Sequence, residues 1–232
     1  MDSWAALFDW DGVIIDSSRQ HGESWQRLAA EERRVLPPDH FYRGFGMKNE
    51  KIIPELLQWT TDAEEIRRLS LRKEELYRQI IRERGVAALP GVAAWLDAIH
   101  SAGIPCVIGS STHRENITTT LGVLGFENYF RAIVSSEDVS HGKPDPEVFL
   151  KAAAKAGTPA NRCVVFEDAH AGIEAARRAG MKVVGVATTH PASSLTGADQ
   201  IVHRLDELTV AGVVALVCCA SEQRPHSING GR

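Results

Sequence analysis

Short runs of hydrophobic residues recur along the chain, and most contain few or no polar side chains. They span residues 4–8, 104–108, 132–134, 163–166, 182–186 and 200–202. Apolar runs of this length are typical of strands that are buried on both faces, as in a parallel sheet. Amphipathic segments separate the runs, so strand and helix alternate. This alternation predicts an α/β fold with a Rossmann-like, doubly wound parallel sheet.

Helix-end signals support the predicted helices between these strands. Residues 92–102 lead to Gly103, and glycine is common just beyond the last residue of a helix. Asp145 and Pro146 suit the start of a later helix, with Asp145 as the N-cap and Pro146 at the first helical position. We therefore expect one helix to end just before Gly103 and another to begin just after its N-cap, Asp145.

The stretch 62–84 predicts a long, charged and amphipathic helix. Thr61 and Glu64 have the spacing of a capping box at its start. The spacing of Glu64 from Arg68 is that of an i,i+4 ion pair, as is the spacing of Glu74 from Arg78. We therefore expect a charged helix face in contact with solvent.

The chain divides into three parts by these patterns. Residues 17–85 contain no convincing strand, so the sequence predicts a small all-helical domain inserted after the first strand. Residues 1–16 plus 86–217 form the predicted α/β core. Residues 218–232 lack periodicity, and we expect a poorly ordered tail.

Composition narrows the functional classes. The chain has 232 residues and a net charge of −4, which gives no electrostatic reason to expect nucleic acid or an anionic membrane as partner. No apolar run approaches the roughly 20 residues of a membrane-spanning helix. The first residues lack a secretory pattern, and the four cysteines form no CxxC pair. We expect a cytoplasmic protein, either a monomer or a weak homodimer.

Polar side chains follow the first four predicted strands. They are Asp9, Asp11, Ser110, Lys143, Glu167 and Asp168. The carboxyl ends of parallel strands lie at one edge of the sheet, and doubly wound folds bind their ligands beyond that edge. We therefore expect these side chains to converge on one site.

Three of these acids predict a metal site. Asp9, Glu167 and Asp168 offer the hard oxygen ligands that Mg²⁺ prefers. Carboxylates packed together repel one another unless a cation lies among them. The predicted cofactor is therefore Mg²⁺.

The same edge has the groups that phosphoryl transfer requires. Mg²⁺ and Lys143 would neutralise a phosphoryl group, and the Ser110 hydroxyl would donate to one of its oxygens. A carboxylate nucleophile such as Asp9 would split the reaction into two easier steps. Asp11 would protonate the leaving oxygen and later deprotonate the attacking one. These four residues are the predicted catalytic set.

Four segments resemble the four motifs of the haloacid dehalogenase superfamily, in order and in spacing. They are residues 9–17, 107–111, 141–149 and 165–173. The resemblance covers roughly residues 4 to 217. The helical insert is similar to the small cap of the branch that contains β-phosphoglucomutase and many sugar-phosphate phosphatases.

The resemblance implies a role for each motif residue. Asp9 is the nucleophile and a Mg²⁺ ligand, and the backbone carbonyl of Asp11 is a further ligand. Asp168 is the second carboxylate ligand, and Glu167 binds directly or through water. Ser110 and Lys143 hold the transferring phosphoryl group.

Substrate-binding residues are expected in the cap and just after the second motif. Gly46 and Lys48 lie between predicted cap helices, where the resemblance implies a substrate-reading loop. His21 matches a histidine that meets the active site in the mutase branch. Ser111 and Arg114 follow Ser110, and Arg114 could reach a substrate phosphate. A helix–helix turn, a solvated histidine and a surface arginine are alternatives that the sequence leaves open.

Several reactions use this scaffold. Asp11 argues against a dehalogenase and a phosphonatase, although Lys48 and Lys51 keep a phosphonatase open. β-Phosphoglucomutases have a lysine just before the cap-loop glycine and an arginine three residues after it, where this chain has Phe45 and Asn49. We therefore expect a phosphatase that acts on a small phosphorylated metabolite such as a sugar phosphate. A mutase is the main alternative, followed by a phosphonatase and a non-catalytic metabolite-binding module.

Overall fold

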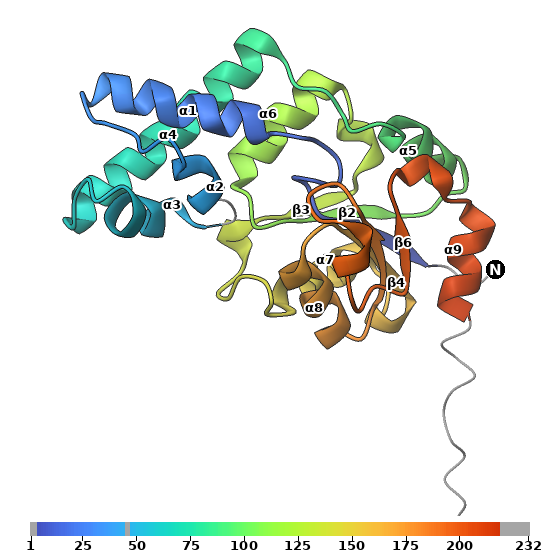
Figure 1. The fold of residues 1–232 in the computed structure, drawn as a ribbon. Coiled ribbons are helices and arrows are strands. Elements are labelled where there is room, and N and C mark those ends of the chain that lie inside the picture. The colour runs from blue at the N-terminus through green and yellow to red at the C-terminus, as the bar shows by residue number, and fades with distance from the viewer. Residues whose placement is uncertain (1–3, 45–46, 219–232) are drawn as a thin grey trace, which may run out of the picture. The chain divides into compact units, whose positions relative to one another are not determined.

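The computed structural model describes residues 4–44 and 47–218 (Figure 1). The strands are β1 (Ala5–Phe8), β2 (Cys106–Gly109), β3 (Ala132–Val134), β4 (Cys163–Glu167), β5 (Lys182–Val186) and β6 (Gln200–Val202). The α-helices are α1 (Ser18–Glu31), α2 (His40–Gly44), α3 (Asn49–Lys51), α4 (Ala63–Arg84), α5 (Val92–Ser101), α6 (Arg114–Leu124), α7 (Glu147–Ala156), α8 (His170–Arg178) and α9 (Val210–Cys218). Within these ranges no helix combines the length and the apolar character needed to span a bilayer. The predicted tail lies outside the described residues, apart from Cys218.

The six strands form one parallel sheet in the order β3-β2-β1-β4-β5-β6. All six predicted strands are confirmed, and no strand end differs from its predicted position by more than two residues. The strand order changes direction between β1 and β4, where Phe8 pairs with both Ile108 and Phe166. A doubly wound sheet places its ligand site beyond the strand ends at this switch point.

Both faces of the sheet are covered, which explains the uninterrupted apolar runs. On one face Leu7 and Val165 lie in a buried cluster with Phe149 of α7 and Ile173 of α8. Strand side chains alternate between faces, so Phe8 and Phe166 point the other way, where their rings stack 4.5 Å apart. The Trp95 ring of α5 lies 5.9 Å from that of Phe166. Figure 1 shows α7 and α8 together on one side of the sheet.

Two predicted helix starts were each wrong by one residue. Helix α7 begins at Glu147 with Pro146 as its N-cap rather than Asp145, because the Asp145 carboxylate accepts the Glu147 N–H at 2.9 Å and makes a turn before the helix. Helix α4 has Asp62 as its N-cap rather than Thr61, and Asp62 accepts the Glu65 N–H at 2.8 Å. Aspartate competes well with threonine for this position.

The ion pairs expected along α4 were also wrong. Arg68 pairs with Glu32 of the α1 end at 2.6 Å. Glu74 is buried and bonds Lys73 at 2.9 Å rather than Arg78. Arg68 therefore pairs outside its own helix and Glu74 pairs with the preceding residue, so neither i,i+4 pair forms. One stripe of the charged face, which includes Lys73 and Glu74, lies inside the protein.

Backbone contacts divide the chain into two units. One comprises residues 16–87 and 115–125, and the other comprises residues 1–15, 88–114 and 126–232. In the helical unit α1 packs on α4, and Leu28, Leu69 and Leu76 lie in its buried cluster. The grouping of 115–125 with the helices differs from the sequence-based boundaries, which gave that stretch to the core. Those domain boundaries stay a prediction.

Candidate active site

Asp9 and Glu167 lie beside each other at the switch point of the sheet. Asp9 directly follows β1, and its N–H donates to the Phe166 carbonyl at 3.0 Å, which extends the β1–β4 pairing by one residue. Glu167 is the last residue of β4. Both side chains are buried or nearly so. The register of two neighbouring strands thus fixes both acids.

Lys143 joins these two acids. Its Nζ donates to Asp9 Oδ1 and to Glu167 Oε1, each at 2.7 Å, and lies 4.8 Å from the centre of the Phe149 ring. Burial alone would lower the pKa of Lys143, but the charges of Asp9 and Glu167 raise it above its ordinary value. Lys143 therefore remains a cation at neutral pH and offsets part of the negative charge.

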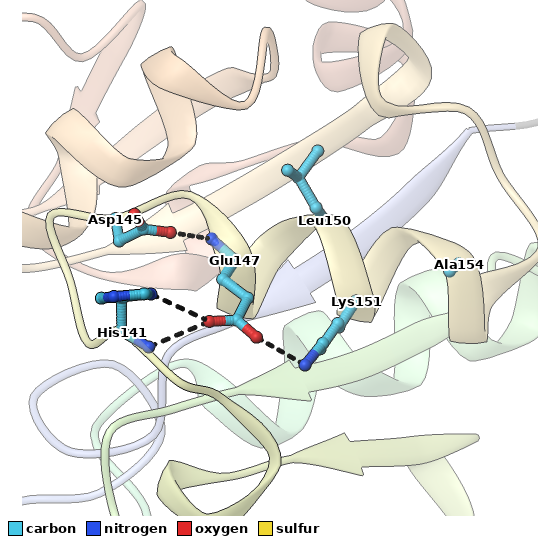
Figure 2. Close-up of a pocket in the computed structure, with 6 residues that line it drawn as sticks. All are labelled: His141, Asp145, Glu147, Leu150, Lys151 and Ala154. Carbon is cyan, nitrogen blue, oxygen red and sulfur yellow. Dashed lines mark hydrogen bonds and ion pairs between the residues drawn. The ribbon is translucent and has the colours of Figure 1, made fainter.

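The loop that carries Lys143 is anchored to α7 (Figure 2). Glu147 accepts the N–H groups of Ser140 and His141 at 2.8 and 2.9 Å, and it pairs with Lys151 at 2.5 Å. A pocket of about 490 Å³ lies over these contacts. Its lining residues are His141, Asp145, Glu147, Leu150, Lys151 and Ala154. Asp9, Glu167 and Asp168 do not line this pocket, so we do not assign it to catalysis. The contacts beneath it anchor the loop.

Three carboxylates form a cluster that fits a divalent cation. One ligand oxygen from each of Asp9, Glu167 and Asp168 lies within 4.8 Å of the others. Burial, and then the charges of Glu167 and Asp9, raises the pKa of Asp168 to about 8. Burial likewise raises the pKa of Glu167, against the opposing effect of Lys143. Hard oxygens under such mutual repulsion are a donor set that suits Mg²⁺.

Two glycines leave the space that these carboxylates occupy. Gly12 has a φ of +83°, and a Cβ there would lie 2.0 Å from Asp168 Oδ2. A Cβ on Gly172 would lie 1.7 Å from Glu167 Oε1. Glycine at position 12 permits both this positive φ and the close approach of Asp168. Any side chain at either position would displace a candidate metal ligand.

Three threonines at the site were missed from the sequence. Thr189 donates to Asp168 Oδ2, and Thr188 donates to the carbonyl oxygen of Gly12. Thr112 donates to Asp11 Oδ2 at 2.5 Å. In the sequence we considered the polar residues that follow the first four strands. Extending the same search to β5 would have found Thr188 and Thr189.

The residues after β2 are held by the core. Ser110 is buried, its N–H donates to the Val134 carbonyl at 2.9 Å, and its Oγ accepts the Thr112 N–H at 3.1 Å. Ser111 is exposed. The Arg114 guanidinium pairs with Asp138 and also donates to the Ile133 carbonyl. The positive charge of Arg114 is therefore already compensated within the protein.

The predicted cap residues have different surroundings. Gly46 lies outside the described residues, and Lys48 is exposed just before α3. His21 is partly buried in the helical unit, where two side chains of α4 contact its ring. Its ring stacks on Tyr77 at 4.1 Å, and its Nδ1 lies 2.7 Å from Lys73 Nζ. Because the lysine ammonium only donates, His21 Nδ1 is the acceptor and its proton is on Nε2.

The partial burial of His21 and its contact with Lys73 predict an acid-sensitive fold. Burial, and then the charge of Lys73, lowers the pKa of His21 from 6.5 to about 3. Between these values the unfolded chain binds a proton that the folded chain does not, so stability is full above 6.5 and falls as the pH decreases. His21→Gln keeps an acceptor but cannot titrate. From about pH 8 to about pH 5, the unmodified protein should lose about 2 kcal/mol more unfolding free energy than the variant.

Denaturant unfolding at several pH values measures this difference. Both proteins share every other titrating group, including Asp168, whose raised pKa acts in the opposite direction. Exposed His203 supplies the control, because the variant His203→Gln should keep the full slope. Equal slopes for the unmodified protein and His21→Gln would contradict the burial of a neutral His21.

Known proteins with similar sequences identify the family. Residues 6–186 match the haloacid dehalogenase-like hydrolase family. The chain is 39% identical over 208 residues to the chloroplastic 5-amino-6-(5-phospho-D-ribitylamino)uracil phosphatase of Arabidopsis thaliana. The matched region covers 88% of this chain and 55% of that protein. The chain thus spans about half the length of this relative. It is 32% identical to β-phosphoglucomutase of Bacillus subtilis, over 89% of this chain and 92% of that protein.

A solved structure with the same fold supports this family assignment. It is a HAD hydrolase of family IA, variant 3, from Entamoeba histolytica, with a TM-score of 0.83 and 27% identity over 93% of this chain and 99% of that chain. The predicted class of enzyme, a phosphatase or a closely related phosphomutase, is confirmed. The motifs, the parallel sheet and the relatives lead to one conclusion: this chain belongs to the haloacid dehalogenase-like hydrolase family.

Proposed function

We propose that the chain hydrolyses phosphate monoesters of small sugars or sugar alcohols, with Mg²⁺ and an aspartyl phosphate on Asp9. The main support is the buried group of Asp9, Lys143, Glu167 and Asp168 at the switch point of the sheet. It combines a nucleophile, a cation and a metal-binding donor set in one place. Both named relatives act on phosphate esters of polyhydroxylated carbon chains, which supports the substrate class.

The proposed reaction has two displacements. In the first, an Asp9 carboxylate oxygen attacks the phosphorus, the phosphorus–oxygen bond to the alcohol breaks, and Asp11 protonates the departing oxygen. In the second, water attacks the same phosphorus and gives a proton to Asp11. The bond between phosphorus and Asp9 then breaks, and inorganic phosphate leaves. Ser110 and Lys143 hold the phosphoryl oxygens through both steps.

Mg²⁺ would be held by Asp9, Asp168 and Glu167, together with the backbone carbonyl of Asp11. When bound, it supplies positive charge that lets a phosphate group approach clustered carboxylates. We propose residues 1–16 plus 86–217 as the catalytic core and 17–85 as the cap. Within the cap and after β2, the proposed substrate contacts are Gly46, Lys48, His21, Ser111 and Arg114.

A phosphomutase is the second candidate, supported by the similarity to the Bacillus subtilis enzyme over most of both chains. A mutase must bind a second phosphate with cationic groups. Asn49, which stands where the resemblance implies an arginine, is a buried amide that donates to Ser70 and Glu74. An amide engaged inside the protein, in place of a cation at this position, favours hydrolysis.

A phosphate-release screen tests the proposal. The purified chain should release inorganic phosphate from at least one sugar phosphate or phosphorylated sugar alcohol, a set that includes 5-amino-6-(5-phospho-D-ribitylamino)uracil. Release should require Mg²⁺ and stop when EDTA removes it, because the carboxylates otherwise repel the substrate. A coupled assay for glucose 6-phosphate from β-glucose 1-phosphate should run beside it. Rapid isomerisation with little free phosphate would favour the mutase, and no turnover of any ester would contradict both.

A further inference from the structure

Thr112 is fixed from several sides in the loop between β2 and α6. Its N–H donates to Ser110 Oγ at 3.1 Å, and its carbonyl accepts the Ser136 N–H at 3.2 Å. Its hydroxyl donates to Asp11 Oδ2 at 2.5 Å, across 101 positions of sequence. The hydroxyl therefore stands at a defined place relative to the ends of both β1 and β2.

We propose that Thr112 is a positioning residue that sets the rotation of the Asp11 carboxyl group for proton transfer. This inference rests on the proposed function and deepens it, because Asp11 is there the general acid and base. The terminal torsion of an aspartate is broad and has no strong intrinsic preference. A donor fixed by its own backbone supplies the preference that the aspartate lacks.

The geometry also links the proton donor, Asp11, to Ser110, the proposed phosphoryl-binding residue. Ser110, which would hold a phosphoryl oxygen, is bonded to the backbone of Thr112, and Asp11 is bonded to its side chain. One residue thus keeps the proton donor in register with the phosphoryl group. Positioning of this kind matters greatly, since a misplacement of about 1 Å can reduce a rate by roughly 10²-fold.

The step that depends on this position is the first displacement. The Asp9–phosphorus bond forms, the bond from phosphorus to the alcohol oxygen breaks, and its electron pair stays on that oxygen. The oxygen then takes the proton from the Asp11 carboxyl group. An alkoxide is a poor leaving group and needs this proton, whereas p-nitrophenolate leaves readily without it. The benefit of Thr112 should therefore depend on the leaving group.

Thr112→Val removes the hydroxyl and nearly preserves the shape of the side chain. For an alkyl phosphate taken from the screen, kcat/KM should fall about 10–100-fold, the scale of a misplaced acid. For p-nitrophenyl phosphate it should change less than about 3-fold. The ratio kcat/KM is the right quantity because it includes only the steps up to release of the alcohol. Thr112→Ser keeps the hydroxyl and should restore most of the alkyl-ester rate.

Controls separate positioning from folding. Thr118→Val alters an exposed threonine that bonds its own helix, and it should leave both esters unaffected. Thermal unfolding shows whether Thr112→Val is folded, and Thr112→Ala replaces it if it is not. Equal losses on both esters, or no loss on the alkyl ester, would overturn the role of Thr112. Failure of the proposed function would give a different result: the unmodified protein would release no more phosphate than Asp9→Asn. That result would overturn the role of Thr112 as well.

Discussion

Asp9→Asn should abolish turnover, with kcat lowered by roughly 10⁵-fold or more, the scale for removing a nucleophile that acts as part of a unit. An amide oxygen is a poor nucleophile and a weak ligand for a hard cation. Asparagine has nearly the same shape as aspartate, and its amide oxygen can still accept from Lys143, which also keeps its bond to Glu167. The fold should therefore survive. Phosphate release under single-turnover conditions measures the loss of the chemical step.

The control for this variant is another aspartate of the same structural unit. Asp97 is exposed on α5 and bonds Tyr129 at 2.5 Å. Asp97→Asn should turn over at the rate of the unmodified protein. Calorimetric titration with Mg²⁺ adds a second readout, because Asp9→Asn should bind the ion more weakly while Asp97→Asn does not. Turnover near the unmodified rate in Asp9→Asn would exclude Asp9 as the nucleophile.

The sequence located the acids because it located the strand ends. Apolar runs fix where each strand stops, and parallel pairing brings those stops to one edge. Asp9 and Glu167 are therefore neighbours because each stands at the end of a strand that the sequence alone predicts. Lys143 is different, since it lies on a loop well beyond β3. The sequence predicted that it reaches the same edge of the sheet, but only the structure shows that its Nζ contacts Asp9 Oδ1.

The errors share a physical cause, which is the choice of partner. Glu74 has the local spacing to pair with Arg78, yet it bonds Lys73 and two asparagines inside the helical unit. An i,i+4 pair on a helix contributes only about 0.2–0.5 kcal/mol, so burial and tertiary contacts outweigh it. Thr112 was missed because a single threonine in a loop forms no sequence pattern that identifies its partner. Only the fold shows that its hydroxyl faces Asp11.

Lys143→Met should lower the free energy of unfolding by about 3–5 kcal/mol, the usual cost of removing one partner from a buried ion pair. Methionine replaces the aliphatic stem but not the ammonium, so the carboxylates of Asp9 and Glu167 stay buried without their shared cation. Denaturant unfolding measures the change. Lys151→Met, which removes an exposed lysine from its pair with Glu147, should cost no more than about 1 kcal/mol.

A second substitution identifies the source of that loss. If unpaired negative charge destabilises Lys143→Met, then adding Asp9→Asn should recover part of the stability, because one buried charge is removed. Asp9→Asn alone should not stabilise the protein, since Lys143 would then lose a partner. The two changes should therefore be strongly non-additive in a double-mutant cycle. Mg²⁺ should stabilise Lys143→Met more than the unmodified protein, because a cation among the acids compensates the missing ammonium. Additive effects with no response to Mg²⁺ would mean that packing, rather than charge, is what Lys143 contributes to the fold.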